Sequence, residues 1–213
     1  MTKIFISMCC HRAIEPLAVD CLIRTLSNPA YQFDYAFQME AGIDRSRSIQ
    51  ATKFLEESDA DVLLFLDDDI LYNLEEVPRI IEDCIEKQSI VCGPYSKKEE
   101  GGQINCVPLH TEDVKLGANG KLMEICWGAT GFMAIPRNVL ASMAAGMRKA
   151  KIKSDLDVYP FFLPMLHEVN GDLIWLSEDY AFCARAREKG FKIWMDTRCQ
   201  IGHMGDKIYV PGM

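Results

Sequence analysis

The chain has 213 residues, of which 49% are hydrophobic and 25% are charged, and its formal net charge at pH 7 is −8. This balance is typical of a globular protein with a sizeable core, and it excludes a disordered chain or a fibrous repeat. The acidic charge, without any basic tract, argues against binding along a phosphate backbone, so we expect no nucleic acid partner.

The apolar runs and the cysteines bear on location. No apolar run approaches the roughly 20 residues that a membrane-spanning helix needs, and the amino terminus lacks the plan of a signal peptide. The nine cysteines are scattered and form no Cys-x-x-Cys pair. This pattern disfavours a disulfide scaffold and a zinc knuckle. We therefore expect reduced thiols in the core of a cytoplasmic protein with no membrane span.

The first hundred residues alternate apolar runs of strand length with amphipathic stretches of helix length. The expected strands cover residues 3–9, 33–38, 61–66 and 89–92. The expected helices cover residues 14–26, 44–57 and 77–87, and Asp44 is a plausible N-cap of the second. This order predicts a parallel α/β sheet, in which ligands bind beyond the carboxyl ends of the strands.

The pattern changes in the second half of the chain. Residues 103–126 predict an antiparallel hairpin with turn signals at 117–120. Helices are expected from Pro136 to about residue 149, and from a cap at Ser177 to Gly190. A last strand at 191–195 should lead into a loop that carries His203. Residues 151–170 have the weakest signal, and we expect a mobile loop there.

Three adjacent carboxylates, Asp67, Asp68 and Asp69, follow the strongest strand signal in the chain. Neighbouring like charges repel one another, so a cation is expected beside them. Carboxylate oxygens suit Mg²⁺ or Mn²⁺. In an extended chain Asp67 and Asp69 would point to one side and form a two-carboxylate clamp. The alternative is that the triplet caps a turn or a helix start near Asn73.

The run Leu-Leu-Phe-Leu-Asp-Asp-Asp-Ile at residues 63–70 resembles the DxD signature of GT-A glycosyltransferases. The resemblance implies one GT-A domain over residues 1–213, with a mostly parallel central sheet flanked by helices and a small antiparallel hairpin region. Its nucleotide-binding half would be residues 1–100 and its acceptor-binding half residues 101–213. The order of elements is also similar to that of the amino-terminal transferase domain of chlorella-virus capsid-glycan proteins.

The same resemblance implies roles for the triplet and for a distant histidine. Asp69 would bind the metal directly, Asp67 would serve the metal or the ribose, and Asp68 would take a ribose hydroxyl. His203, which lies between Gly202 and Gly205, resembles the histidine that completes the metal sphere in many of these enzymes. A nitrogen ligand beside carboxylates favours Mn²⁺ over Mg²⁺. The alternative for His203 is an ordinary surface or core residue.

Glu178 and Asp179 open a helix behind Ser177, where the helix dipole favours ionised carboxylates. By resemblance to inverting GT-A enzymes, Asp179 is the candidate catalytic base, with Glu178 as the second candidate. Acidic residues in a first helical turn are also ordinary stabilising residues, and that reading stays open.

Further residues resemble the parts of the family that line the donor. Trp127, Gly128 and Ala129 begin a glycine-containing segment that would admit a sugar, although a tight bend with a core tryptophan is the alternative. Arg45 and Arg47 lie where the family often has an Arg-Asn pair near the nucleotide, but Ser46 replaces the asparagine. The residues expected to cradle the base and ribose after the first strand are Cys10, His11 and Arg12.

These observations favour a metal-dependent transferase of the hexosyl or deoxyhexosyl class. The expected donor is a UDP-sugar, and the expected acceptor is a hydroxyl of a glycan or glycoprotein, attacked with inversion. A nucleotidyltransferase and a catalytically silent nucleotide- or glycan-binding module are the alternatives. The chain could also be one domain of a longer multidomain protein.

Overall fold

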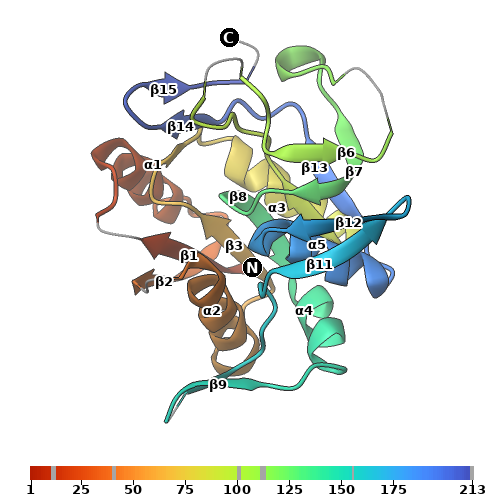
Figure 1. The fold of residues 1–213 in the computed structure, drawn as a ribbon. Coiled ribbons are helices and arrows are strands. Elements are labelled where there is room, and N and C mark those ends of the chain that lie inside the picture. The colour runs from red at the N-terminus through yellow and green to blue at the C-terminus, as the bar shows by residue number, and fades with distance from the viewer. Residues whose placement is uncertain (11–12, 40–41, 100–101, 111–113, 155, 212–213) are drawn as a thin grey trace.

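The computed structural model describes residues 1–213 except 11–12, 40–41, 100–101, 111–113, 155 and 212–213. Its central sheet contains β1 (Lys3–Cys10), β2 (Gln32–Met39), β3 (Val62–Leu66), β5 (Ile90–Cys92), β6 (Cys106–Pro108), β7 (Leu122–Gly128), β8 (Phe132–Pro136) and β13 (Ile193–Asp196). The eight strands lie in the order β2-β1-β3-β8-β5-β13-β7-β6 (Figure 1). Strands β7 and β8 run opposite to the others.

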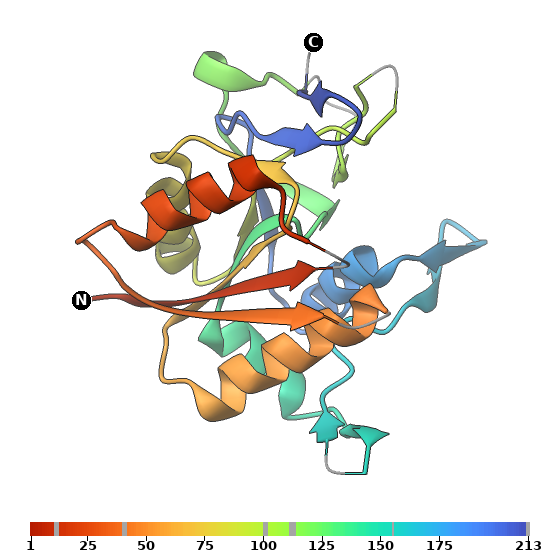
Figure 2. The same ribbon diagram turned by 90° about the vertical axis from the view of Figure 1, so that its left-hand side faces the viewer.

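Helices cover both faces of this sheet. They are α1 (Pro16–Leu26), α2 (Ile43–Glu57), α3 (Glu76–Lys87), α4 (Arg137–Ala144) and α5 (Glu178–Glu188). The side chains of α1 and α3 pack into one apolar cluster, and those of α2, α4 and α5 pack into the other. Figure 2 shows α1 and α2 on opposite sides of β1 and β2. Because β1 contributes to both clusters, its sequence is a nearly continuous apolar run.

Strand β8 joins the two halves of the chain in one sheet. It lies between β3 and β5 and pairs antiparallel with both. Leu66 at the end of β3 is opposite Phe132 at the start of β8. The residues that follow Leu66 and those that precede Phe132 therefore meet at the same edge of the sheet.

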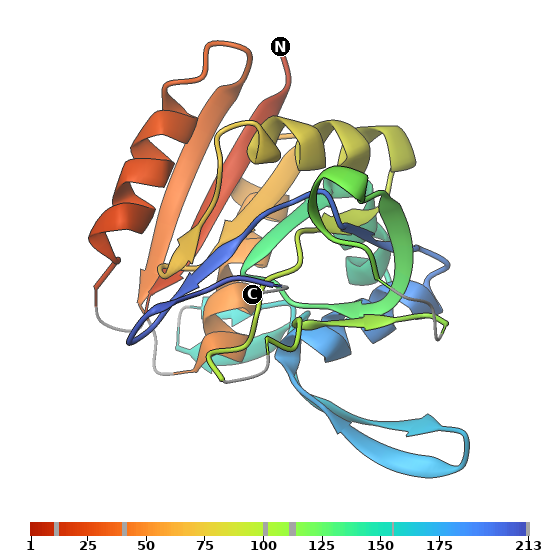
Figure 3. The ribbon, with the colours of Figure 1, turned by 90° about the horizontal axis from the view of Figure 1, so that it is seen from above.

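Shorter strands form three small sheets. They are β4 (Ile70–Leu71) with β14 (Gly202–Met204) and β15 (Ile208–Tyr209), β9 (Ala150–Lys153) with β10 (Leu156–Val158), and β11 (Met165–Val169) with β12 (Asp172–Leu176). The β11–β12 hairpin projects from the body, as Figure 3 shows. Asn170 and Gly171 close it with φ of 53° and 89°. Positive φ at both central residues suits a tight hairpin turn.

Most expected elements are present, with four corrections. The N-cap of α2 is Gly42, and Asp44 lies inside the first turn without a side-chain capping bond. Residues 151–170 contain strands because they pair locally, so the expectation of an irregular loop was wrong. Helix α4 ends at Ala144, short of residue 149. His203 lies in β14 and not in a loop, since β4 supplies it with a partner strand.

The thiols agree with the sequence analysis. All nine cysteines are free, and all but Cys21 and Cys126 are buried. Among the described residues, no helix is both long enough and apolar enough to cross a membrane.

Asp196, at the end of β13, is a buried carboxylate that anchors two arginines. It accepts hydrogen bonds from Arg79 Nε of α3 at 2.8 Å and from Arg198 Nε at 2.6 Å. Burial raises the pKa of Asp196, but the hydrogen bonds from the two arginines outweigh it, so the net pKa is lowered.

We therefore predict that Asp196→Asn lowers the free energy of unfolding at pH 7 by about 2–4 kcal/mol, because the variant removes the buried carboxylate that Arg79 and Arg198 share, although Arg198 keeps its ion pair with Asp83. Because the pKa of Asp196 is lower in the folded state, its carboxylate stabilises the protein at pH values above the unfolded pKa of about 4. This stabilisation is lost as the pH falls below that value. Urea denaturation should show that the difference in free energy of unfolding between wild type and variant becomes smaller as the pH falls through that range. The exposed Asp172→Asn is the control, and a gap independent of pH would contradict the assignment.

Candidate functional site

A buried arginine joins three elements at the carboxyl end of β3. The Arg47 side chain, from the first half of α2, is 4% exposed. Its Nη1 donates to Glu178 Oε1 at 2.7 Å, and its Nη2 donates to both carboxylate oxygens of Asp67, at 3.1 and 3.0 Å. One guanidinium thus holds the end of β3 against the start of α5.

The charges in this cluster depend on one another. Burial lowers the pKa of Arg47, but attraction to Asp67 and Glu178 outweighs burial and leaves the pKa raised. The pKa of Glu178 is also raised, because burial and repulsion from Asp179 and Asp67 outweigh the attraction of Arg47. Arg47 is therefore a permanent cation shared by two carboxylates.

A turn separates Asp67 from Asp69. The Ile70 N–H donates to the Asp67 carbonyl at 3.3 Å, which is the hydrogen bond of a β-turn centred on Asp68 and Asp69. The triplet therefore does not continue β3, and the alternation of an extended strand does not apply to it. The expected clamp of Asp67 and Asp69 on one side assumed that alternation.

Asp69 faces a second set of partners. Its Oδ2 lies 2.5 Å from Lys98 Nζ and 3.5 Å from His203 Nε2. Burial raises the pKa of Asp69, but the hydrogen bonds from His203 and Lys98 outweigh it, so the net pKa is lowered. Asp69 is therefore an anion with a lysine and a histidine at one oxygen.

Strand pairing places His203 at Asp69. Strand β14 runs antiparallel to β4, and the Met204 N–H donates to the Asp69 carbonyl at 2.8 Å. The His203 Nδ1 lies 2.8 Å from the Ser96 carbonyl, which can only accept, so Nδ1 carries a proton. Nε2 faces Asp69 Oδ2, where it can donate to that oxygen only if the ring carries a second proton; in the neutral ring Nε2 is the unprotonated nitrogen through which a histidine can bind a metal.

Among the described residues, no group of three His, Cys, Asp or Glu side chains could hold a metal ion. The three predicted ligands are therefore not assembled, because Arg47 engages Asp67 while Asp69 and His203 meet elsewhere. The pair of Asp69 and His203 does fit two positions of a divalent cation, which would take one carboxylate oxygen and the Nε2 of the neutral histidine ring.

Two glycines near the turn from β7 to β8 lie close to the ends of other strands, and Gly131 is the one that allows a close approach to Asp67. A Cβ on Gly131 would lie 2.8 Å from Asp67 Oδ2 and 2.6 Å from Tyr95 Oη. A Cβ on Gly128 would lie 2.5 Å from Cys92 Sγ. The Asp67 N–H also donates to the Gly131 carbonyl at 2.9 Å. The segment from Gly128 to Gly131, with the buried Ala129, thus lies at the carboxyl ends of β5 and β3.

Trp127 lies in an aromatic group beside α5. Its ring stacks on Tyr180, with centroids 5.6 Å apart and an interplanar angle of 24°, and meets the edge of His167 at 6.4 Å. Trp127 is half-buried. Trp127 is therefore only partly in the core, and it lies close to the acidic start of α5.

Asp179 follows Glu178 but has different contacts. Its Oδ1 accepts from the Ser177 hydroxyl and, at 2.8 Å, from the Tyr180 N–H. Both contacts use the same oxygen. Among the described residues no hydrogen bond or ion pair engages Asp179 Oδ2, so this oxygen can still accept a hydrogen bond. The carboxylate of Glu178, in contrast, already accepts one from Arg47.

The remaining predicted residues have different outcomes. Cys10 is buried at the end of β1, and burial together with Asp68 and Asp67 raises the pKa of its thiol to about 11, so it stays neutral beside the triplet. The Asp68 carbonyl accepts from the Glu15 N–H at 2.9 Å, which ties the triplet to the start of α1. His11 and Arg12 lie outside the described residues.

Of the two arginines in α2, Arg45 is exposed and Arg47 is buried at the centre of the site. A signal for this difference exists in the sequence. Arg47 shares a helix face with Ala51 and Phe54, at spacings of four and seven residues, and both belong to the core. Arg45 lies off that face.

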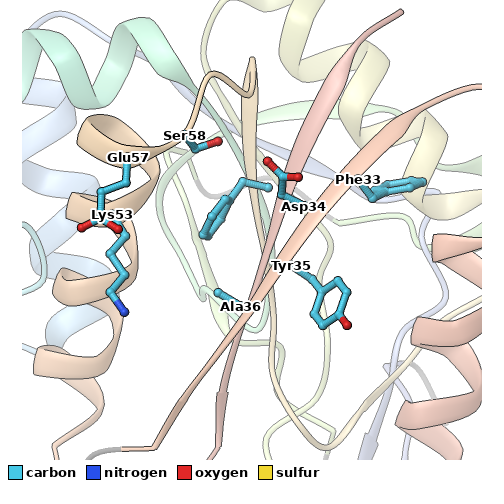
Figure 4. A pocket seen from close by; sticks show the side chains of 8 residues that line it. Phe33, Asp34, Tyr35, Ala36, Lys53, Glu57 and Ser58 are labelled. Atoms are coloured by element: carbon cyan, nitrogen blue, oxygen red, sulfur yellow. The ribbon is translucent and has the colours of Figure 1, made fainter.

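A hollow of about 500 Å³ lies elsewhere, between β2 and the later part of α2. Figure 4 shows Lys53 and Glu57 on one side of it and Asp34 on the other. None of the predicted site residues lines it.

The fold has relatives among solved structures. A197 from STIV matches with a TM-score of 0.62 and 19% identity over 100% of this chain and 95% of that chain. GalNAc-T7 with UDP, GalNAc and Mn²⁺ matches with a TM-score of 0.52 and 12% identity over 95% of this chain, which spans 43% of that chain. No protein-family model and no curated protein matches the sequence. The chain has the GT-A type of mixed α/β fold, with a large central sheet flanked by helices.

We predict that Arg47→Met lowers the free energy of unfolding at pH 7 by about 3–5 kcal/mol, because it leaves the partly buried Asp67 and Glu178 without their cation. Urea denaturation measures the loss. The triple variant Arg47→Met, Asp67→Asn, Glu178→Gln is the matched control, and it should recover most of the stability because the unpaired charges are gone. A single variant as stable as wild type would show that Arg47 does not hold these elements together.

Proposed function

We propose that this protein is a glycosyltransferase that moves a sugar from a nucleotide diphosphate donor, a UDP-sugar, to a hydroxyl of a glycan or glycoprotein. The observation that carries the proposal is the meeting of Asp69 and His203 beyond the carboxyl end of β3. Ligands of open α/β sheets bind at that edge. The similarity to GalNAc-T7, whose structure contains UDP, GalNAc and Mn²⁺, supports the class of donor.

Asp69 and His203 would hold a divalent cation, and their mixed donor set favours Mn²⁺ over Mg²⁺. When bound, the ion neutralises charge on the diphosphate leaving group. Asp67 is oriented by Arg47 and given room by Gly131, and it would bind either the metal or the ribose of the nucleotide. Asp68 would take a ribose hydroxyl.

Asp179 is the proposed base. Its Oδ2 would accept the proton of the acceptor hydroxyl as that oxygen attacks the sugar carbon, which inverts the anomeric centre. Glu178 is the weaker candidate, since Arg47 engages its carboxylate at 2.7 Å. Trp127, stacked on Tyr180 next to Asp179, would offer its partly exposed ring to an apolar sugar face.

The other walls of the donor site follow the sequence resemblance. Gly128 and Ala129 would line the sugar, and Cys10 would lie beside the ribose together with His11, Arg12 and Arg45. We also propose a single domain whose nucleotide-binding half, residues 1–100, and acceptor-binding half, residues 101–213, share the central sheet. A cytoplasmic location suits its free thiols. A capsid glycan as acceptor, implied by the likeness to chlorella-virus proteins, belongs to the same proposal.

We predict that Asp69→Ala removes the Mn²⁺-dependent part of the thermal stabilisation by UDP, because it deletes one of two ligands, with Mn²⁺ affinity falling at least ~10-fold. Thermal shift with and without Mn²⁺ measures the effect. Asp206→Ala, which removes an exposed acid from the β14–β15 turn, is the control and should behave as wild type. Wild-type protein that shows no Mn²⁺-dependent response to UDP or any UDP-sugar would end the proposal.

We predict that Asp179→Asn keeps UDP and Mn²⁺ affinity within about 2-fold and slows sugar transfer by roughly 10²–10⁴-fold, because it removes a base and leaves the metal pair intact. The measurement is donor turnover across a panel of nucleotide sugars. Glu188→Gln, at the far end of α5, is the control. Full activity in Asp179→Asn would refute the base assignment, whereas binding without turnover in wild type would identify a silent binding module.

A further inference from the structure

A lysine stands at the position that the proposed metal needs. Lys98 Nζ lies 2.5 Å from Asp69 Oδ2, and His203 Nε2 lies 3.5 Å from the same oxygen. Lys98 and His203 therefore lie at the same oxygen of Asp69, and the lysine ammonium already neutralises it. A lysine is a compact point charge with three donors, so it can neutralise a carboxylate in the place of a metal ion.

The backbone holds the start of this lysine's loop in place. Ser96 forms a bridge with Ile104, and the Lys97 N–H donates to the Gln103 carbonyl at 2.9 Å. Ser96 also accepts the Nδ1 hydrogen bond of His203 through its carbonyl. The residue that orients His203 is thus two positions before Lys98, and the loop carries both the ammonium and the support of the ligand.

The aliphatic stem of Lys98 has a place made by a glycine. A Cβ on Gly205 would lie 3.2 Å from Lys98 Cδ and 3.2 Å from Tyr209 Cε2. Gly205, which follows β14, therefore leaves space for the lysine to reach Asp69. The Lys98 side chain is still 38% exposed, so its ammonium can leave Asp69 without unfolding its surroundings.

A divalent ion on Asp69 and His203 would come close to the ammonium of Lys98, and like charges at that separation repel strongly. Lys98 must therefore move when the ion binds. A diphosphate bound to that ion would be the nearest new anion, and lysine suits phosphate oxygens as a point charge.

We propose that Lys98 is an internal counter-ion that competes with the metal for Asp69 and transfers to the diphosphate of the donor. The proposal rests on the function proposed above and adds a coupling to it. The metal alone must break the ion pair between Lys98 and Asp69 and leave Lys98 without an anion. Metal and nucleotide together give Asp69 the metal and Lys98 the diphosphate as partners. The two therefore bind more tightly together than separately.

The test compares Lys98→Met with the control Lys97→Met. The control removes the same charge one residue earlier in the chain, and the Lys97 side chain makes no ion pair with any described residue. Calorimetry measures Mn²⁺ binding to each protein without nucleotide, and UDP binding at saturating Mn²⁺. For Lys98→Met we expect Mn²⁺ alone to bind about 3–5-fold tighter, since a partly exposed ion pair no longer competes. We expect UDP to bind about 10-fold weaker, since a charge-assisted contact is lost.

Opposite signs in the two titrations distinguish this role from simple damage, which would weaken both. Lys97→Met should stay within about 2-fold of wild type in both. Lys98→Gln, which keeps a polar side chain, should repeat the result if Lys98→Met folds poorly. Unchanged or weaker Mn²⁺ binding, or unchanged UDP binding, in the folded Lys98 variants overturns the proposal. If wild type binds no UDP in Mn²⁺, the proposed function fails as well.

Discussion

The structure depends most on the buried ion cluster of Arg47 with Asp67 and Glu178. The Arg47 side chain, which is 4% exposed, loses its hydration and regains stability chiefly from these two carboxylates. The three groups come from α2, from the end of β3 and from the start of α5. Their mutual attraction fixes how α2, the end of β3 and the start of α5 meet, and it does not engage the Oδ2 of Asp179, the next acid on α5.

The position of β8 gives this cluster its surroundings. Because β8 lies between β3 and β5, the glycine segment before Phe132 arrives at the end of β3. Gly131 then both accepts the Asp67 N–H and leaves room for the Asp67 carboxylate. The halves inferred from the sequence are therefore not separate bodies, since a strand of the second half lies inside the sheet of the first.

Three acids of the site have a positive partner within the protein. Arg47 is shared by Asp67 and Glu178, while Lys98 is at Asp69. In a protein of net charge −8, these local cations reduce the repulsion that a polyphosphate would otherwise meet. The two cations differ in kind. Arg47 is buried and held by several hydrogen bonds, whereas Lys98 is partly exposed and held by one oxygen, so only Lys98 is suited to move.

The sequence by itself determined the elements with strong periodicity, including β1, β3, α1, α3 and the β6–β7 hairpin. A strand or helix that buries a given face must carry apolar residues at the spacing of that face, and this spacing is visible in the sequence. It also placed the acidic triplet at the end of β3. Only the tertiary structure decided the pairing of β14 with β4, the turn at Asp68, and the pairing of Arg47 with Asp67 and Glu178. These features arise from contacts between segments far apart in the chain, and local propensity carries no information about which distant partner a short strand or a buried charge will find.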